Sequence, residues 1–584
     1  MKALSYLNKY FVKYKYRLIF GTVCAIIAQI LALVTPVLIG DSLDVVEEYL
    51  KGTVTGLDAV KDQLLRDILT ILGAVLLAGI FRFFMRQAII VMSRYIEYDL
   101  KNEVYTHYQK LSLNFYKQNK IGDLMNRISE DVSKVRMYFG PAIMYSINMV
   151  TLFIVVISYM FHTDVTLTLY TLIPLPVLSV SIYLLSREIN HRSKVVQQYL
   201  SKLTAVTQEY FSGMQVVKAY AIEEPTFKYF NHTAKQSKEK NIAYYKLQAL
   251  FFPLMILLIG VSNIMVIYIG GMRYINGVIT FGVIAQFIVF VNMLTWPVAA
   301  VGWITSIVQT AEASQYRINE FLNTTPEITN PTNDKMTVKG EVSFKNVSLR
   351  YQDSNTPAVQ DVSFHVKPGE TLAILGKTGS GKTTVANLIA RLYDADSGQI
   401  LVDGTPISEF NLDTLRSSMG YVPQEDFLFS DTIANNIKFG NENATRKEIE
   451  DAAKNAHIHH SITQFSKGYE TFIGERGVTL SGGQKQRISI ARALIKDPKI
   501  LILDDCLSAV DTETEEIILN HLERISKNKT TFIITHRVSS AKNVDKIIVM
   551  EEGKIVQQGT HDQLMEQEGF YKTIYNQQLS EQFS

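Results

Sequence analysis

The stretch TLAILGKTGSGKTT occupies residues 371–384. Its segment Gly376–Thr383 fits the pattern GxxxxGK[ST], in which glycines let backbone N–H groups turn inward around phosphates. The apolar run before the loop is typical of a buried strand, and the following residues, TTVANLIARLY, favour a helix. The N-terminus of that helix would add the positive end of its dipole. This stretch therefore predicts a nucleotide-binding loop in an α/β domain.

The side chains of this loop have different expected roles. Lys382 is expected to reach the β- and γ-phosphates of a nucleotide, and Thr383 is expected to ligate Mg²⁺. A chance glycine turn is the alternative, which the flanking strand and helix disfavour. The other residues that we expect to surround the phosphates are Gly376, Lys377, Thr378, Gly379, Ser380, Gly381 and Thr384.

Two further motifs follow the loop. The run KILILD ends in Asp504, and a carboxylate at the end of a buried strand can hold the Mg²⁺ shell, directly or through water. LSGGQ, at Leu480–Gln484, is a second anion-binding turn, in which Ser481 and the backbone of Gly482 and Gly483 can donate to a phosphate. One chain seldom needs two such turns for one nucleotide. We therefore expect each nucleotide to lie between two domains, one of which gives the phosphate loop and the other LSGGQ. Gln484, the last residue of LSGGQ, is expected to bind the nucleotide together with the rest of that turn.

The part of the chain before residue 325 is far more apolar than the rest. Six stretches there are each near the ~20 residues that cross a bilayer, at about 17–40, 65–92, 139–161, 165–186, 248–271 and 283–307. A large soluble helical core is the alternative, but six such runs between charged segments are hard to bury. The formal net charge of the 584-residue chain is +2, which gives no indication of a nucleic-acid partner.

The charge of the loops orients these stretches. Lysine and arginine are concentrated before the first stretch and between the second and third, whereas the loop after the first is acidic. Cationic loops stay in the cytosol, so we expect a multi-pass protein of the cytoplasmic (inner) membrane with the soluble half and both termini cytosolic. The long cytosolic helices are expected to break near 119–122 and 212–213, where another domain could make contact.

A polar, proline-containing run, NTTPEITNPTND at 323–334, separates the two halves. After it, the β-rich runs GEVSFKNVSLRY, DVSFHV, TLAILG, ILILDD and TTFIITH alternate with helical ones. We therefore expect an α-helical membrane domain of six transmembrane helices at 1–322, a linker at 323–338, and an α/β P-loop nucleotide-binding domain at 339–584.

With the phosphate loop, LSGGQ and ILILDD in that order behind six spans, the chain resembles an ABC exporter half-transporter over nearly its whole length. The resemblance implies that Tyr351 stacks on adenine and that His536 contacts the γ-phosphate. It implies that Gln424 senses the γ-phosphate, holds the metal and touches the membrane domain. Glu475 and Ser508–Asp511 match segments that contact the coupling helices and cross the dimer interface. The catalytic residues implied are Asp505, His536 and Gln424.

Asp505 departs from the family pattern, in which a glutamate usually polarises the attacking water. The aspartate is one methylene shorter, which moves the carboxylate by roughly 1–1.5 Å, and such a misplacement can lower a rate about 100-fold. We favour a heterodimer in which this chain carries the slow site and its LSGGQ completes the partner's site. A homodimer that uses Asp505 as the working carboxylate and a drift without consequence are the alternatives.

The resemblance implies export by alternating access, driven by ATP with Mg²⁺. The partners implied are a second half-transporter, membrane lipid, and an amphipathic drug or lipid as substrate. An ATP-gated membrane regulator with little turnover is the alternative on the same scaffold, and a soluble ABC ATPase conflicts with the six spans.

Polar and aromatic residues within the spans are candidates for substrate contact, with helix–helix hydrogen bonding as the alternative. Arg82 and Arg86 fall near the cytosolic end of the second span. For them we favour snorkelling or lipid-headgroup pairing over binding of an anionic substrate. The polar and aromatic candidates are Asn148, Gln286, Asn292, Trp296 and Trp303.

Overall fold

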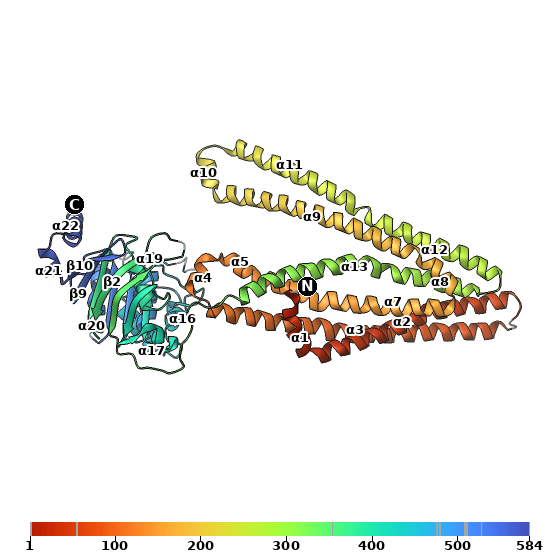
Figure 1. The fold of residues 1–584 in the computed structure, drawn as a ribbon, viewed down its shortest axis with the longest axis horizontal. Helices are drawn as coiled ribbons and strands as arrows, with labels where there is room; N and C mark the ends of the chain where they lie inside the picture. Colours follow the sequence, from red (N-terminus) through yellow and green to blue (C-terminus); the bar gives the residue numbers. More distant parts are fainter. Residues whose placement is uncertain are drawn as a thin grey trace. The chain divides into compact units, whose positions relative to one another are not determined.

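The computed structural model describes residues 3–53, 56–352, 354–474, 477, 480–506, 512–526 and 528–582. The chain forms two compact units. The first unit comprises residues 1–109 and 121–324 and is helical, and the second comprises 110–120 and 325–584 and holds both β-sheets (Figure 1). Residues 110–120 therefore belong to the second unit in space, although they interrupt the first unit in sequence.

Long helices build the first unit. Helices α2, α7 and α13 pack against one another, and α9 runs beside α11 (Figure 1). The helices of this unit are η1 (Ala3–Leu7), α1 (Asn8–Lys13), α2 (Lys15–Leu50), α3 (Leu57–Lys110), α5 (Ile121–Asn126), η2 (Arg127–Asp131), α6 (Val132–Met137), η3 (Tyr138–Ala142), α7 (Ile143–Thr163), α8 (Val165–Leu172), α9 (Pro174–Ser212), α10 (Met214–Ala219), α11 (Glu223–Gln248), α12 (Phe251–Ile275) and α13 (Phe281–Leu322).

Five helical segments among the described residues are long and apolar enough to cross a membrane: Lys15–Leu50, Leu57–Lys110, Ile121–Thr163, Glu223–Ile275 and Phe281–Leu322. They contain five of the six expected spans. The remaining span, 165–186, is divided between α8 and α9, because the chain turns at Ile173 and a new helix begins at Pro174. Proline has no N–H to donate, so it favours the first position of a helix over its interior. The expected fourth span is therefore present as two helices.

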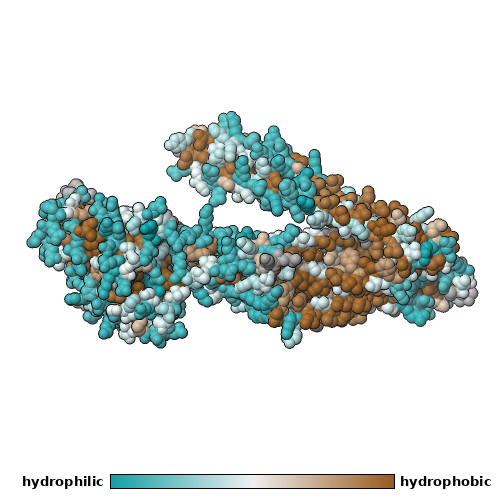
Figure 2. Space-filling view, in the orientation of Figure 1, coloured by the Kyte–Doolittle hydropathy of each residue, from teal (hydrophilic) through white to brown (hydrophobic). Residues whose placement is uncertain are grey.

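Apolar side chains face outward over the middle of the first unit. On α3, Leu69, Leu72 and Leu76 are 58%, 55% and 61% exposed. Figure 2 shows hydrophobic residues gathered over this region, whereas the α9–α11 end of the same unit is hydrophilic. A broad apolar exterior of this kind fits a lipid-facing surface and disfavours a soluble helical core.

Both predicted breaks in the long cytosolic helices are confirmed. Helix α4 (Leu113–Gln118) ends at Asn119, which has an extended backbone, and α5 begins at Ile121. Helix α9 ends at Ser212, and Gly213 separates it from α10.

A six-stranded sheet of order β10-β9-β3-β8-β7-β6 forms the centre of the second unit. Its strands are parallel except β10, which is antiparallel to β9. A four-stranded antiparallel sheet, β2-β1-β4-β5, shares a core with it, in which Phe364 of β2 lies 6.5 Å from Phe532 of β8 between ring centroids. The strands are β1 (Val342–Leu349), β2 (Val359–Val366), β3 (Thr371–Gly376), β4 (Ser397–Val402), β5 (Thr405–Pro406), β6 (Met419–Val422), β7 (Ile500–Asp504), β8 (Thr530–Thr535), β9 (Lys546–Glu551) and β10 (Lys554–Gly559).

Helices surround these sheets, and the five predicted β-rich runs correspond to β1, β2, β3, β7 and β8. The helices of the second unit are α4, α14 (Lys382–Ile389), α15 (Leu412–Ser417), α16 (Ile433–Lys438), α17 (Arg446–Asn455), α18 (His459–Thr463), α19 (Gly482–Leu494), α20 (Thr512–Ser526), α21 (His561–Glu566) and α22 (Phe570–Gln582), with short 3₁₀ turns η4 (Ile407–Glu409) and η5 (Gly468–Glu470).

Neighbouring parallel strands end together at one edge of the large sheet. Strand β8 lies between β3 and β7, and all three run in the same direction. Their carboxyl ends, at Gly376, Asp504 and Thr535, therefore meet at the same edge. Ligands in open α/β sheets bind outside the carboxyl ends of the strands, so we expect a ligand-binding site at this edge.

Candidate functional site

A cavity of about 260 Å³ opens at the carboxyl ends of β3, β7 and β8. The phosphate loop forms one side of it, and the residues that follow β7 and β8 form the other. Its lining residues are Tyr351, Ala358, Thr378, Gly379, Ser380, Gly381, Lys382, Thr383, Thr384, Gln424, Asp504, Asp505, Ile534 and His536.

Close packing explains a glycine in the phosphate loop. Gly381 has a φ of +98°, in the left-handed region, and a Cβ atom there would lie 2.2 Å from the carbonyl oxygen of Ala358. Only glycine fits this position. It places the loop against the N-terminus of α14, where the first backbone N–H groups of the helix have no helical partners and can donate to an anion.

Lys382 is held in place by the loop that it serves. Its Nζ donates to the carbonyl oxygens of Gly376 and Lys377, at 2.8 Å each. Burial lowers the pKa of the Lys382 ammonium, and the nearby carboxylates of Asp505 and Asp504 oppose that shift. A cation fixed in this way is preorganised to pair with a phosphate oxygen.

Thr383 and Asp504 meet across the cavity. The Thr383 hydroxyl donates to Asp504 Oδ1 at 3.2 Å. Asp504 is fully buried, and its Oδ2 has no hydrogen-bond partner among the described residues. Burial raises the pKa of Asp504 to about 6. A buried carboxylate oxygen without a partner, beside a hydroxyl, fits a hard cation such as Mg²⁺, which prefers oxygen ligands. Gln424 lines the same cavity and is exposed at its mouth.

Asp505 and His536 both line the cavity and form a pair. His536 Nδ1 lies 2.9 Å from Asp505 Oδ1, and the backbone N–H of Asp505 donates to the carbonyl of Ile534 at 2.8 Å. Asp505 has a φ of +49°. Aspartate enters the left-handed region more readily than longer side chains do. The backbone thus offers a second reason for a short carboxylate here, besides the slow site expected from the sequence.

Tyr351 also lines the cavity, to which it offers an aromatic ring. Its hydroxyl lies 3.0 Å from the hydroxyl of Thr384, which explains why Thr384 is turned inward and buried. Its ring packs edge-on against Tyr393, with 5.1 Å between centroids. Lys117 of α4, within the second unit, places Nζ 4.5 Å from the centroid of the Tyr351 ring.

Helix α4 and its neighbours make further contacts inside the second unit. Gln118 donates to Gln352 at 2.7 Å, and Ser112 and Asn114 both donate to Glu327 at 2.9 Å. Helix α4 overlaps the start of the predicted coupling region Phe115–Val132. These contacts therefore attach that region next to Tyr351, which lines the cavity. Sequence reasoning did not single out Lys117, because a lone lysine in a basic segment carries no signal of its own.

Lys377 differs from the other expected loop residues. Its ammonium lies over the ring of Phe570, 5.4 Å from the centroid, and the residue does not line the cavity. Its contribution in this structure is its backbone carbonyl, which accepts from Lys382. Gly376 likewise lies beneath the loop and contributes the other carbonyl.

The LSGGQ turn lies apart from this cavity. Ser481 caps α19, accepting from the backbone N–H of Gln484 at 3.3 Å, while the Gln484 side chain accepts from the N–H of Ser481 at 3.0 Å. No residue of Leu480–Gln484, all of them described, lines the cavity. Within one chain the phosphate loop and the signature turn are thus separate. Glu475 and Ser508–Asp511 lie outside the described residues.

The polar and aromatic candidates of the membrane spans divide into two groups. Gln286 donates to the carbonyl of Val37 at 3.2 Å, and Asn292 donates to Ile288 one turn back at 2.8 Å, so both serve helix structure. Trp303 packs against Tyr145, with 5.3 Å between ring centroids. Asn148 and Trp296 instead line a pocket of the first unit.

Comparison with known protein families identifies the family of this chain. Residues 18–298 match the model of the ABC transporter transmembrane region, and residues 359–508 match the ABC transporter model. The chain belongs to the ABC transporter family. The domain that holds the cavity is therefore the ATPase domain of an ABC transporter, which hydrolyses ATP in a reaction coupled to transport.

Relatives of this ABC transporter cover nearly all of its length. It is 34% identical over 583 residues to the multidrug resistance-like ATP-binding protein MdlA of Escherichia coli, covering 100% of this chain and 97% of that protein. It is 38% identical to the uncharacterized ABC transporter ATP-binding protein YknU of Bacillus subtilis, covering 82% and 83%. A solved bacterial Atm1-family ABC exporter with ATP bound matches with a TM-score of 0.78 and 25% identity over 98% of each chain. These findings confirm the resemblance to an ABC exporter half-transporter.

Proposed function

We propose that this ABC transporter is one half of a dimer that exports amphipathic drugs or lipids across the cytoplasmic membrane by alternating access. In this proposal residues 1–322 are the membrane domain, 323–338 the linker and 339–584 the ATP-driven domain, with that domain and both termini in the cytosol. The observation that carries the proposal is the separation of the phosphate loop from LSGGQ within one chain. A second chain must then supply the missing turn. The multidrug names of its relatives favour amphipathic cargo.

In the proposed cycle, the phosphate loop holds the ATP phosphates through Lys382 and its backbone, and Tyr351 offers its ring to adenine. Thr383, Asp504 and Gln424 would hold Mg²⁺, which would neutralise charge on the phosphates. The partner's LSGGQ closes the site from the other side. Because ATP binds the closed dimer more tightly than the open one, its binding shifts the population toward the closed state. Hydrolysis then removes that preference and resets the transporter.

The carboxylate of Asp505 would orient the attacking water, and His536 would hold that carboxylate and reach the γ-phosphate. The shorter side chain would leave the water poorly placed, which makes this the slow site. We infer a heterodimer, in which the intact LSGGQ of this chain serves a faster site on the partner. A homodimer with two Asp505 sites is the alternative.

Export predicts movement of an amphiphile in one direction. In sealed inside-out vesicles that contain the native complex, ATP should drive accumulation of at least one member of a panel of anionic, neutral and cationic fluorescent amphiphiles well above the level without nucleotide. Vesicles that carry Lys382→Ala in this chain should lose most of that accumulation. ATP-dependent ion conductance without accumulation of any amphiphile tested would contradict export and favour an ATP-gated regulator.

The heterodimer predicts a particular mass. Native mass spectrometry of a gently extracted complex, tagged on this chain, should show one 66.1 kDa copy together with a second, different chain of similar mass. The second chain should carry glutamate at the position of Asp505. A mass of twice 66.1 kDa would establish the homodimer and make Asp505 the working carboxylate of both sites.

A further inference from the structure

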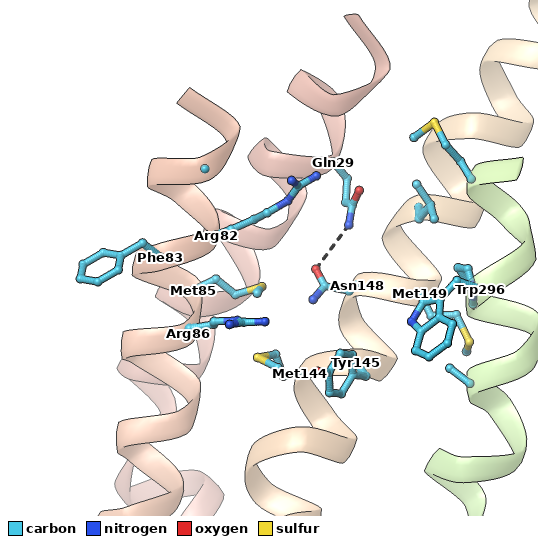
Figure 3. A pocket seen from close by; sticks show the side chains of 15 residues that line it. Gln29, Arg82, Phe83, Met85, Arg86, Met144, Tyr145, Asn148, Met149 and Trp296 are labelled. Atoms are coloured by element: carbon cyan, nitrogen blue, oxygen red, sulfur yellow. Dashed lines mark hydrogen bonds between the residues drawn. The ribbon is translucent and has the colours of Figure 1, made fainter. Parts of the chain in front are cut away.

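A pocket of about 630 Å³ lies inside the first unit, between α2, α3, α7 and α13. Figure 3 shows Arg82 and Arg86 reaching from α3 into this pocket, toward Gln29 of α2 and Asn148 of α7. Trp296 stands on the other side, on α13. The pocket is distinct from the ATP cavity, which belongs to the second unit.

The two arginines give this pocket an uncompensated positive charge. Arg82 and Arg86 are one helical turn apart and therefore share a face of α3. The pocket lining contains no aspartate or glutamate, and neither arginine forms an ion pair within the part of the chain that the structure describes. Several other arginines of the same unit are paired: Arg94 with Glu97, Arg273 with Asp164, and Arg317 with Asp131.

Their direction disagrees with the snorkelling that we favoured from the sequence. A snorkelling arginine extends along the membrane toward the interface, whereas both of these side chains point across the bundle (Figure 3). Charged residues within membrane spans that face a cavity mark substrate or ion pathways more often than they serve structure.

The remaining walls combine neutral hydrogen-bonding groups with polarisable apolar surface. The amide nitrogen of Gln29 lies 3.5 Å from Asn148 Oδ1, at the outer limit of a hydrogen bond, so both amides can turn to a ligand. Met144, Met149, Met293 and Trp296 supply much of the apolar wall. Methionine adapts to irregular ligand shapes. The pocket thus has a cationic end and an apolar body.

We propose that this pocket binds the anionic head group of an amphipathic molecule, with Arg82 and Arg86 on the acid group and the methionine and tryptophan side chains along its apolar tail. The inference rests on the proposed export function and narrows its substrate class to anionic amphiphiles. Guanidinium groups suit this task because they bind carboxylate or phosphate oxygens through two parallel N–H donors.

Trp296 provides a local readout of binding, because the chain has only one other tryptophan, Trp303. The assembled transporter is placed in nanodiscs of neutral phosphatidylcholine and titrated with ω-bromoundecanoate, whose bromine quenches tryptophan. The signal assigned to the pocket is the quenching that disappears in Trp296→Phe. The anionic probe should give this signal at a concentration at least about tenfold lower than its trimethylammonium counterpart. Equal quenching by both probes would overturn the proposal.

Variants of the arginines test the charge itself. The double variant Arg82→Gln, Arg86→Gln should weaken binding of the anionic probe by about tenfold or more, since two charge-assisted contacts are lost. Arg82→Lys with Arg86→Lys keeps the charge and should retain binding within about threefold, which separates loss of charge from misfolding. Arg66→Gln is the matched control, because Arg66 lies on the same helix outside the pocket and, among the described residues, its side chain donates only to the backbone carbonyl of Asp62. Unchanged binding in the glutamine pair would overturn the assignment.

A transport assay distinguishes the two sources of such a head group, an exported substrate and a lipid of the membrane. In phosphatidylcholine proteoliposomes, ATP-dependent movement of dansylaminoundecanoate that requires the arginines would identify a cargo site. Arginine-dependent binding that phosphatidylglycerol competes away, without movement, would identify a lipid head-group site and keep the pocket while contradicting anionic cargo. A transporter that moves cationic dyes but neither binds nor moves the anionic probes would keep export and overturn the pocket.

Discussion

Replacing Lys382 with alanine should weaken ATP binding at this chain's phosphate loop by about 100-fold or more. Lys382 is the only lysine or arginine among the described residues that line the cavity, and its ammonium is held by the loop carbonyls of Gly376 and Lys377. Each charge-assisted hydrogen bond contributes about 1.5–3 kcal/mol, so the loss of two of them accounts for this factor. Photocrosslinking with azido-ATP, scored separately on each chain of the complex, measures the effect on this site alone.

The neighbouring lysine supplies the control. Lys377→Ala removes the same charge from the same loop, but the Lys377 ammonium lies over Phe570 and outside the cavity. Its ATP affinity should stay within about threefold of the unchanged protein. Equal losses in the two variants would mean that the general charge of the loop, and not the position of Lys382, determines binding. Unchanged crosslinking in Lys382→Ala would refute the assignment of the loop.

Lengthening Asp505 to glutamate should raise ATP turnover at this site, by up to about 100-fold if the missing methylene is what limits it. The carboxylate now lies against His536, at 2.9 Å, and a longer side chain could keep that contact while reaching farther toward the phosphates. The expected gain is reduced by the left-handed backbone at this residue, which glutamate adopts less readily than aspartate. Single-turnover hydrolysis in a complex whose partner site is inactivated measures this site by itself.

Asp505→Asn distinguishes a slow site from a silent one. The amide keeps the length and the hydrogen bond to His536 but cannot take a proton from water. If Asp505 works as a carboxylate, residual turnover should fall about tenfold or more in this variant. If Asp505→Glu leaves the rate unchanged and Asp505→Asn does too, the limit on turnover lies elsewhere than in this side chain.

The local features of this protein could be predicted from its sequence. The phosphate loop is a contiguous strand–loop–helix pattern, and the strand ending at Asp504 is a continuous apolar run, so neither depends on distant residues. The helix breaks at Asn119 and Gly213 were predictable for the same reason. The division of the fourth span at Pro174 was missed, although the proline that starts α9 was visible. The average apolarity of 165–186 concealed it.

Features that depend on tertiary packing could not be predicted. Lys117 lies over the ring of Tyr351 only because α4 packs within the second unit. The rest of that unit begins at residue 325, far from α4 in sequence. The ammonium of Lys377 points away from the loop and lies over the ring of Phe570, a residue near the C-terminus. The direction of Arg82 and Arg86 into the bundle depends on how α3 is rotated against α2 and α7, which spacing along one helix does not determine.

The discontinuous second unit also has a consequence for synthesis. Residues 110–120 leave the ribosome long before the remainder of their unit, which begins at Thr325, 205 residues after position 120. At a translation rate of about 5–20 residues per second, the segment waits roughly 10–40 s for its contacts. During that interval Ser112 has no Glu327 to bond and Lys117 has no Tyr351 to cover. Docking of this short segment is therefore a late event of biogenesis, possible only once translation has passed the linker and the strands behind it.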